Sequence, residues 1–224
     1  MHIPDGFING ATSAGFGVAA AGGVGAAIKQ TGRYLNERQV PLAGLVAAFV
    51  FAAQMVNFPV TAGVSGHLLG GVLAAVLVGP WAGFVVLSVV LLVQGFLFAD
   101  GGLSALGLNI VNMGFVGAVG GYALYRILLK VTPRNTRGVT IAAGIAAGIA
   151  VPLAAMGFLA QYAIGGTASV SIQAVFTALL GTHALIGIGE GFITAVVVSA
   201  VMRSRPDLVY GAPNYAGERT EALG

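Results

Sequence analysis

Long apolar segments, separated by short polar or glycine-rich stretches, dominate the hydrophobic pattern of the chain. Residues 39–99 contain no Asp, Glu, Lys or Arg, and this length suffices for about three membrane spans of roughly 20 residues each. Apolar runs such as residues 84–92 do not alternate with polar positions, as the strands of a transmembrane barrel do. The pattern therefore predicts an all-α polytopic membrane protein.

We expect seven helices in a single membrane domain that comprises residues 1–224. Glycine, proline and charged residues between the apolar segments mark the helix ends. The predicted domain has an N-terminal segment (1–6), a helical bundle (7–202) and a cytosolic tail (203–224), with a loop at 59–66 and a break in the last helix near Gly181. The expected helices comprise about residues 7–28, 41–57, 67–78, 81–99, 104–130, 139–164 and 172–202.

The basic residues support this number of spans. They cluster at 29–38, 126–137 and 203–205, and basic loops face the cytoplasm. An even number of spans must therefore separate these clusters. Dividing residues 67–99 at Gly79 and Pro80 gives four spans between the first two clusters, whereas one continuous helix gives three. We expect about seven transmembrane helices, with the N-terminus outside and the C-terminus cytoplasmic.

The third expected helix is too short to cross a bilayer. About a dozen residues extend roughly 18 Å, whereas the hydrocarbon core is about 30 Å thick. Its start at His67 should therefore lie inside the membrane. Irregular backbone at that depth is tolerated only where it is buried in protein or lines a cavity, so we expect residues 60–66 to line a cavity.

Composition narrows the chemistry. The chain is 57% hydrophobic and 8% charged, whereas soluble domains contain about 25% charged residues. It has no cysteine, which excludes disulfides and thiolate metal sites. The net charge of +3 comes from basic loops and does not predict nucleic-acid binding. The N-terminus lacks the basic region of a signal peptide, and His2 is too large for removal of Met1, so we expect Met1 to be retained.

The first two residues offer a set of nitrogens for a metal ion. The α-amine of Met1 and the amide nitrogen of His2 close a five-membered ring with a metal, and Nδ1 of His2 closes a six-membered ring with the same amide. A fourth nitrogen completes the square-planar geometry that is typical of Ni(II) and Cu(II). His67 lies on the predicted cavity loop, on the same outer side as the N-terminus, and is the best fourth ligand.

Each of these histidines also has a simpler interpretation. A histidine at position 2 is often a disordered terminal residue, and a single histidine within a membrane often only packs. Two features favour a function. Residues 3–6, Ile-Pro-Asp-Gly, suit a type I turn that would hold the terminus in place, and ionisable residues within membrane spans are functional by default.

Four segments resemble those of a known family: MHIPDGF, FAAQMVNFPV, GVSGHLLGGVLAAVLVGP and FADGGLSALGLNIVNMG. Over most of its length the chain resembles the NikM/CbiM family, the substrate-binding components of nickel and cobalt energy-coupling-factor transporters. The resemblance implies that the Met1 amine, the His2 amide and side chain, and the His67 side chain bind Ni²⁺ or Co²⁺ as the transported substrate. It also implies an additional N-terminal helix beside a six-helix core.

The resemblance further implies partners and a location. The partners are a transmembrane coupling subunit, two ATP-binding cassette ATPases and a small accessory membrane subunit, and the location is the cell membrane of a prokaryote. A stripe of small residues on the second expected helix resembles the surface that docks on the coupling subunit: Ala43, Ala47, Ala48 and Ala52.

Several polar residues are candidates for orienting the ligands. Gln54 and Asn57 share one helix face, as do Asn109 and Asn112. These side chains can orient the histidines or the cavity loop, or they can form ordinary hydrogen bonds between helices, and both interpretations stay open. Ser65 can bond the loop backbone.

Three further polar residues have structural interpretations. Asp5 can fix the tautomer of His2, but it also suits the turn at residues 3–6. His183 and Glu190 are seven residues apart on the last expected helix and therefore share a face, where they can pair with each other or take part in ion passage.

Two other functions fit parts of the sequence. Residues 63–66 match the GxSG motif of rhomboid-like intramembrane proteases, with Ser65 as the nucleophile and His183 as its base, but this alternative leaves MHIPDG unexplained. A secondary transporter needs charged relays near the midplane, for which Glu190 and Asp100 are the candidates. The sequence has no Walker A motif, so we expect a transport component that is not an enzyme, with ATP hydrolysis by separate subunits.

Overall fold

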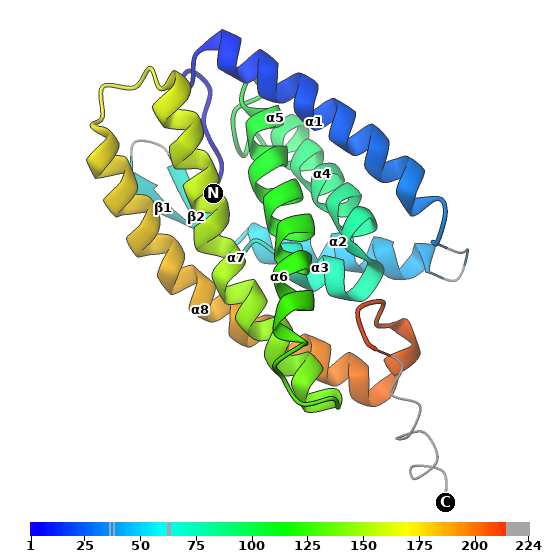
Figure 1. Ribbon diagram of the computed structural model, residues 1–224. Coiled ribbons are helices and arrows are strands. Elements are labelled where there is room, and N and C mark those ends of the chain that lie inside the picture. The colour runs from blue at the N-terminus through cyan, green and yellow to red at the C-terminus, as the bar shows by residue number, and fades with distance from the viewer. Residues whose placement is uncertain (36, 38, 62–63, 214–224) are drawn as a thin grey trace, which may run out of the picture.

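The computed structural model describes residues 1–35, 37, 39–61 and 64–213, and only the backbone of 58–61 (Figure 1). Predictions that concern residues 62–63, Arg38 and most of the tail lie outside these ranges. Helices dominate the described chain: α1 (Gly10–Thr31), α2 (Val40–Gln54), α3 (Gly71–Val78), α4 (Pro80–Leu97), α5 (Leu106–Asn109), the π-helical η1 (Ile110–Gly120), α6 (Gly121–Leu128), α7 (Thr136–Gly165), α8 (Ile172–Ser204) and the 3-10 helix η2 (Pro206–Leu208). A two-stranded hairpin, β1 (Asn57–Thr61) and β2 (Val64–His67), lies between α2 and α3.

The helical, multi-pass membrane character is confirmed. Five helical segments of the described chain are long and apolar enough to cross a membrane: α1, α4, the continuous run from α5 through η1 to α6, α7 and α8. α2 is apolar but has 15 residues, and α3 has eight. The number of seven spans and the orientation of the two termini therefore stay predictions.

The expected loop at 59–66 is wrong. β1 and β2 pair in antiparallel fashion, with Asn57 opposite His67. The ladder satisfies backbone N–H and C=O groups that would otherwise lack partners inside a membrane protein. His67 consequently ends a strand and does not begin a helix, and α3 starts only at Gly71 after Gly70, whose φ of +75° is a left-handed value.

The last long helix also differs from expectation. α8 is continuous from Ile172 to Ser204, so the expected break near Gly181 is wrong. A glycine lowers helix propensity by about 1 kcal/mol but keeps its N–H in the ladder, which a long helix tolerates. The π-helical stretch of η1 had no signal in the apolar pattern.

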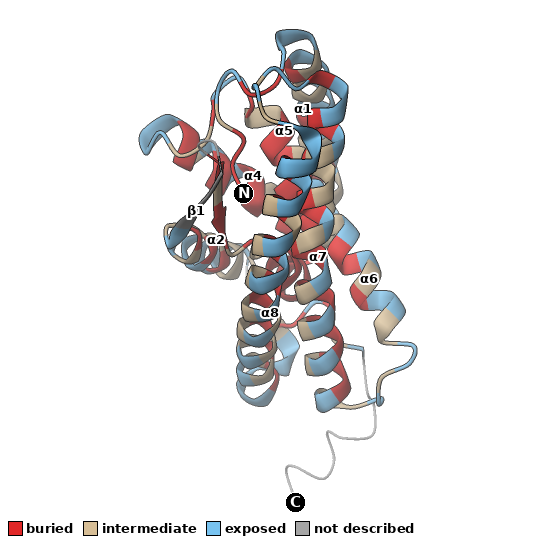
Figure 2. Ribbon diagram, turned by 90° about the vertical axis from the view of Figure 1, so that its left-hand side faces the viewer, coloured by how far each residue is buried: buried red, intermediate tan, exposed pale blue. Residues whose placement is uncertain are grey.

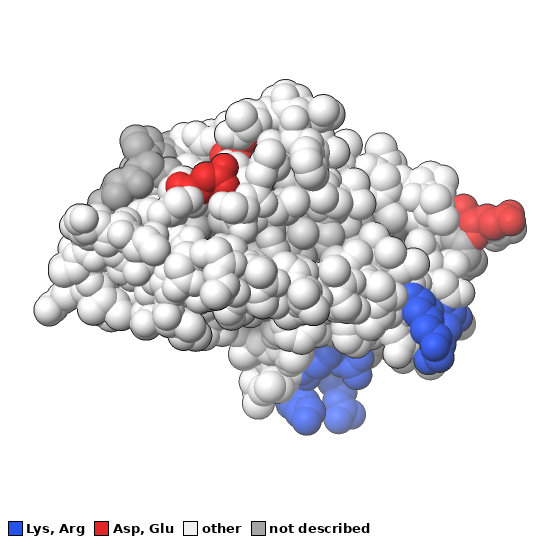
Figure 3. All heavy atoms as spheres, turned by 90° about the horizontal axis from the view of Figure 1, so that it is seen from above, with Lys and Arg blue, Asp and Glu red and all other residues white. Residues whose placement is uncertain are grey.

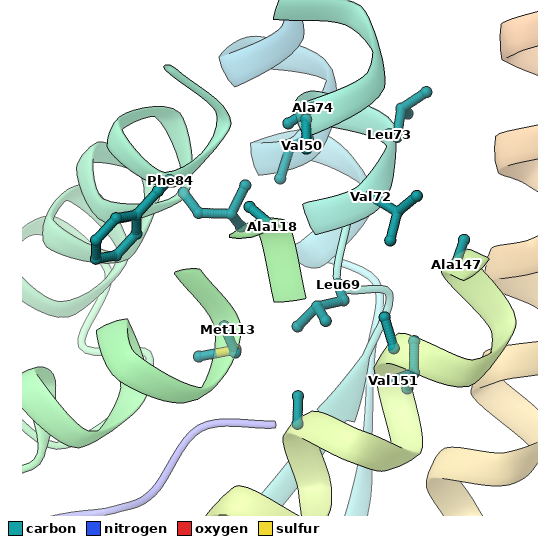
Figure 4. Close-up of a cluster of buried hydrophobic side chains, with 14 of the residues drawn as sticks. Val50, Leu69, Val72, Leu73, Ala74, Phe84, Met113, Ala118, Ala147 and Val151 are labelled. Atoms are coloured by element: carbon teal, nitrogen blue, oxygen red, sulfur yellow. The ribbon is translucent and has the colours of Figure 1, made fainter. Parts of the chain in front are cut away.

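α3 forms the centre of the core. All eight of its residues are buried, and side chains from α2, α4, η1 and α7 surround it (Figure 4). At its end, the N–H groups of Tyr210 and Gly211 donate to the carbonyls of Leu77 and Val76 over 3.2 and 2.9 Å. The segment after α8 thus caps the carbonyls that a helix end leaves unpaired.

The first residues of the chain lie inside the bundle. The N-terminus lies close to β2 and α7 in one view and again within the bundle in the view turned by 90° (Figures 1 and 2). Met1 and Ile3 are 1% and 0% exposed. The segment before α1 is therefore a part of the core, and the interpretation of His2 as a disordered terminal residue is wrong.

Candidate metal centre

The N-terminal segment is anchored where it joins α1. The Asn9 side chain accepts a hydrogen bond from the N–H of Thr12 and so caps the helix. The N–H of Asn9 donates to the Gly165 carbonyl over 2.7 Å, and the N–H of Thr167 donates to the Phe7 carbonyl over 3.0 Å. Residues 7–9 are thereby tied to the end of α7, which directs residues 1–6 inward.

Asn109 holds the middle of the segment. Its Oδ1 accepts a hydrogen bond from the N–H of Ile3 over 2.9 Å, and its Nδ2 donates to the Ile3 carbonyl over 3.4 Å. The N–H of Gly102 donates to the same carbonyl over 2.9 Å. Asn109 therefore pairs with both backbone groups of Ile3, as a neighbouring strand would. This pairing fixes the position of the chain directly after Met1 and His2.

Asp5 ties the turn to the segment that precedes α5. Its carboxylate accepts from the N–H of Ser104 over 2.7 Å and from the N–H of Leu103 over 3.2 Å. Hydrogen bonds from the hydroxyl and the N–H of Ser104 lower the pKa of Asp5. These contacts match the turn interpretation of Asp5 and place no hydrogen bond between Asp5 and His2.

The structure brings His2 and His67 together. Their ring centroids lie 4.7 Å apart, and both side chains are buried, at 3% and 1% exposure. Nδ1 of His67 donates to the Leu68 carbonyl over 2.7 Å, because a carbonyl can only accept. The lone pair of the neutral ring is therefore on Nε2, and this buried atom has no hydrogen-bond partner.

The terminal amine lies within the same buried environment. Burial lowers the pKa of the Met1 α-amine well below its ordinary value, although the charge of Asp100 acts in the opposite direction. Burial also lowers the pKa of His2, and the charge of the amine adds to this effect. Deprotonated amine and neutral imidazole are the forms that bind a metal, so the environment favours ligand forms over charged ones.

Asp100 is a site residue that sequence reasoning did not assign to the metal. Nε2 of His2 lies 3.6 Å from Oδ2 of Asp100, and both atoms are buried without a hydrogen-bond partner. Burial raises the pKa of Asp100, while the nearby amine and a hydrogen bond from Asn57 lower it. Residues 2 and 100 come together only in the tertiary structure. The sequence at residues 100–102, Asp-Gly-Gly, therefore predicted a turn and gave no sign of the contact with His2.

A polar hollow leads from the surface to His2. It measures about 300 Å³, and its lining residues are His2, Pro4, Asp5, Ser65, Ala99, Asp100, Gly101 and Gly102. Seen from the end of the bundle at which α1 begins, a small group of acidic atoms lies among uncharged ones, apart from the basic side chains (Figure 3). Such a hollow favours the approach of a cation.

Side chains alone do not make this a metal site. Within the described part of the chain, no three His, Cys, Asp or Glu side chains gather as a metal cluster. Two imidazoles and one half-buried carboxylate are present, so a metal site here would need further ligands from the backbone. The α-amine and the amide of His2 are the nitrogens next to these rings.

The other candidates for orienting the ligands fall into two groups. Gln54 donates to the Leu69 carbonyl over 2.7 Å, two residues from His67, and Asn57 bonds Asp100. Asn112 instead donates to Gln161 over 2.7 Å, which matches the interpretation as an ordinary hydrogen bond between helices. Ser65 lines the hollow, and its buried hydroxyl has no hydrogen-bond partner.

The protease alternative is not supported. A Ser–His dyad needs a hydrogen bond from the nucleophile to its base. Oγ of Ser65 and Nε2 of His183 are both buried without a partner, and Nδ1 of His183 is bonded to the Leu179 carbonyl of its own helix. The expected pairing of His183 with Glu190 is also wrong, because the Glu190 carboxylate accepts from the backbone of Leu69 and Gly70.

Comparisons with known proteins agree with this arrangement. The family model described as the cobalt uptake substrate-specific transmembrane region, CbiM, matches residues 2–208. The chain is 37% identical over 221 residues to the fused nickel transport protein NikMN of Rhodobacter capsulatus, covering 93% of this chain and 64% of that protein. It is 34% identical over 227 residues to the cobalt transport protein CbiM 1 of Pelobacter propionicus, covering 99% of each.

A solved structure shares the fold. The crystal structure of a truncated transition metal transporter superposes with a TM-score of 0.84 at 29% sequence identity, covering 91% of this chain and 99% of that one. The chain is therefore a multi-pass membrane component of nickel or cobalt transport, and it belongs to the CbiM family.

Proposed function

We propose that this protein binds Ni²⁺ or Co²⁺ through four nitrogens: the Met1 amine, the amide and Nδ1 of His2, and Nε2 of His67. The observation that carries the proposal is the buried N-terminus beside two buried imidazoles whose centroids lie 4.7 Å apart. Four nitrogens in one plane suit Ni(II). The names of the relatives, which include nickel and cobalt transport proteins, support these two ions as substrates.

Binding would release protons from the site. The amine must be neutral and the amide must lose its proton before both bind a metal. Burial of Met1 already opposes its charged form. His67 needs no change of tautomer, because its Nδ1 proton is held by the Leu68 carbonyl and leaves Nε2 available.

The protein acts as the substrate-specific subunit of an energy-coupling-factor transporter in the cell membrane of a prokaryote. ATP hydrolysis comes from two separate ATPases, through a transmembrane coupling subunit, with a small accessory membrane subunit as a further partner. Exposure along α2 supports this assignment: Ala48 and Ala52 are exposed, and Ala43 and Ala47 are half-buried, so the stripe is available for docking. With the N-terminus on the outer side of the membrane, as the basic loops predict, the hollow at His2 opens to the outside.

X-ray absorption spectroscopy of the nickel-loaded protein tests the ligand set. We expect a four-coordinate shell made only of nitrogen, with scattering from two imidazoles. A six-coordinate shell dominated by oxygen would show that the metal is held elsewhere, by carboxylates and water.

Replacement of Gly102 by Ala should displace the N-terminal segment. A Cβ at this position would overlap the backbone nitrogen of Asp5 and lie 2.6 Å from the Pro4 carbonyl carbon, so the backbone of one of the two segments has to move. We expect nickel affinity, measured by titration calorimetry, to fall at least about tenfold. Gly22→Ala is the matched control, because a Cβ there meets nothing within 4 Å. Equal affinities of the two variants would contradict the docking of residues 1–6 at the site.

Asp100→Asn should weaken binding without removing it. With Nδ1 of His2 on the metal, Nε2 carries the proton, and the Asp100 carboxylate oxygen at 3.6 Å can accept it. Partners that orient a ligand histidine typically contribute about 10–100-fold in affinity. We expect a loss of about tenfold by calorimetry, and no change in Asp207→Asn, whose carboxylate pairs with Arg205 at the surface. An Asp100→Asn variant that binds as tightly as the unchanged protein would remove Asp100 from the site.

A further inference from the structure

The described chain contains a buried carboxylate that the metal site does not explain. Glu190 lies in the middle of α8 and is 3% exposed. Its Oε2 accepts from the N–H of Leu69 and its Oε1 accepts from the N–H of Gly70, each over 2.6 Å. One carboxylate from a distant helix therefore holds two consecutive N–H groups that lie directly after His67 and Leu68.

These N–H groups precede α3 and have no partner within that helix. The first N–H groups at a helix start are unpaired and carry the positive end of the helix dipole. Leaving them unpaired in an apolar interior is unfavourable. In the described chain Glu190 forms no ion pair, and its two oxygens satisfy these N–H groups by hydrogen bonds.

Further contacts hold the 68–70 segment in place next to His67. Its Leu68 carbonyl accepts from Nδ1 of His67 over 2.7 Å, and its Leu69 carbonyl accepts from Nε2 of Gln54 over 2.7 Å. Gly70 lies against Val50 so closely that a Cβ would be 2.7 Å from a methyl group. Displacing the segment from Glu190 would therefore move the carbonyl that orients the His67 ring.

We propose that Glu190 is a positioning residue whose carboxylate holds the 68–70 segment, and through it His67, in the orientation that binds the metal. The inference rests on the proposed function, because it takes His67 as a ligand. The 68–70 segment connects His67 to α8 through Glu190 and to α2 through Gln54. Its Leu69 side chain lies among residues of α3, η1 and α7 (Figure 4).

Glu190→Gln is the direct test. The amide keeps the size of the side chain but turns one acceptor into a donor that faces an N–H group, so at least one of the two bonds is lost. We expect nickel affinity of the full-length detergent-purified protein to fall about 30-fold, within the range for partners of metal ligands. Thr194→Val is the matched control. Thr194 is buried one turn further along α8, and together with Glu190 it lines a small crevice between α2 and α8. It should bind within about threefold of the unchanged protein.

A double-mutant cycle separates positioning from a general effect on the fold. If Glu190 acts through His67, Glu190→Gln should change the affinity less than about twofold once His67 is replaced by Ala. The visible absorption spectrum of the nickel-loaded Glu190→Gln variant should also approach that of His67→Ala. An equal affinity loss in both backgrounds would overturn the proposal.

Gln54→Met provides a second route if Glu190→Gln does not fold. It removes the bond to the Leu69 carbonyl and should lower the affinity about fivefold, the size of one hydrogen bond, again only when His67 is present. The outcomes separate the two proposals. If His67→Ala binds nickel with unchanged affinity, the proposed metal site is wrong. If His67→Ala binds nickel more weakly while Glu190→Gln and Gln54→Met keep the affinity of the unchanged protein, only the role of Glu190 is refuted.

Discussion

Insertion of two alanines before Met1 is expected to lower nickel affinity at least about a thousandfold, or about 4 kcal/mol. The insertion keeps every side chain but moves the α-amine away from the chelate with the His2 amide, and it makes the histidine the fourth residue, so that no new chelate of amine, two amides and imidazole replaces the old one. It also requires room for two more residues beside Met1, which is 1% exposed. Calorimetric titration of nickel into both purified proteins measures the difference.

A pair of alanines added after Gly224 is the matched control and should leave the affinity unchanged. Intact-mass measurement checks that the unchanged protein starts with a free amine at Met1. Equal nickel binding by the inserted and unchanged proteins would rule out the amine as a ligand, and the search would move to sites formed by His67 and His183.

Replacement of His67 by Ala is expected to lower nickel affinity about 100-fold, or about 3 kcal/mol. The remaining three nitrogens come from residues 1 and 2 and can still hold the metal, with water as the fourth ligand. The ring of His67 is buried with an unpartnered Nε2, so its removal takes away the proposed fourth ligand. Calorimetry gives the affinity, and the nickel absorption spectrum reports the change of ligand.

His183→Ala is the matched control for this variant. His183 is as deeply buried as His67, but it bonds a carbonyl of its own helix. It should bind nickel within about threefold of the unchanged protein. If His183→Ala loses affinity and His67→Ala does not, the fourth ligand was assigned to the wrong histidine.

The long helices were predictable because their signal is local. Uninterrupted apolar segments with glycine, proline or charged ends predicted α1, α4, α7 and α8 to within a few residues, since a membrane span needs about 20 apolar residues whatever its neighbours are. Gly181 suggested a break in α8 because a local rule does not include tertiary packing, and further along the helix Gly187 and Gly191 pack against α7.

The hairpin and the partners of the site were not predictable in the same way. β1 and β2 have five and four residues, and a proline in β1 and a glycine in β2 obscure any alternation. The pair of Asp100 with His2, and that of Glu190 with Leu69 and Gly70, join residues that lie about a hundred positions apart. His2 and His67 were chosen among the three histidines of the chain because of the N-terminal chelate, the expected cavity loop and the family resemblance, and their roles as ligands stay predictions.

The docking of residues 1–9 has a consequence for biosynthesis. The backbone of this segment pairs with Gly102, Gly165 and Thr167, so its final partners leave the ribosome long after Met1 does. At about 5–20 residues per second, the segment waits roughly 8 seconds or more before the end of α7 exists. The first residues to be synthesised are thus among the last to reach their final place, and a protein stalled before Thr167 would insert most of its helices and still lack the contacts that hold the N-terminal segment at the end of α7.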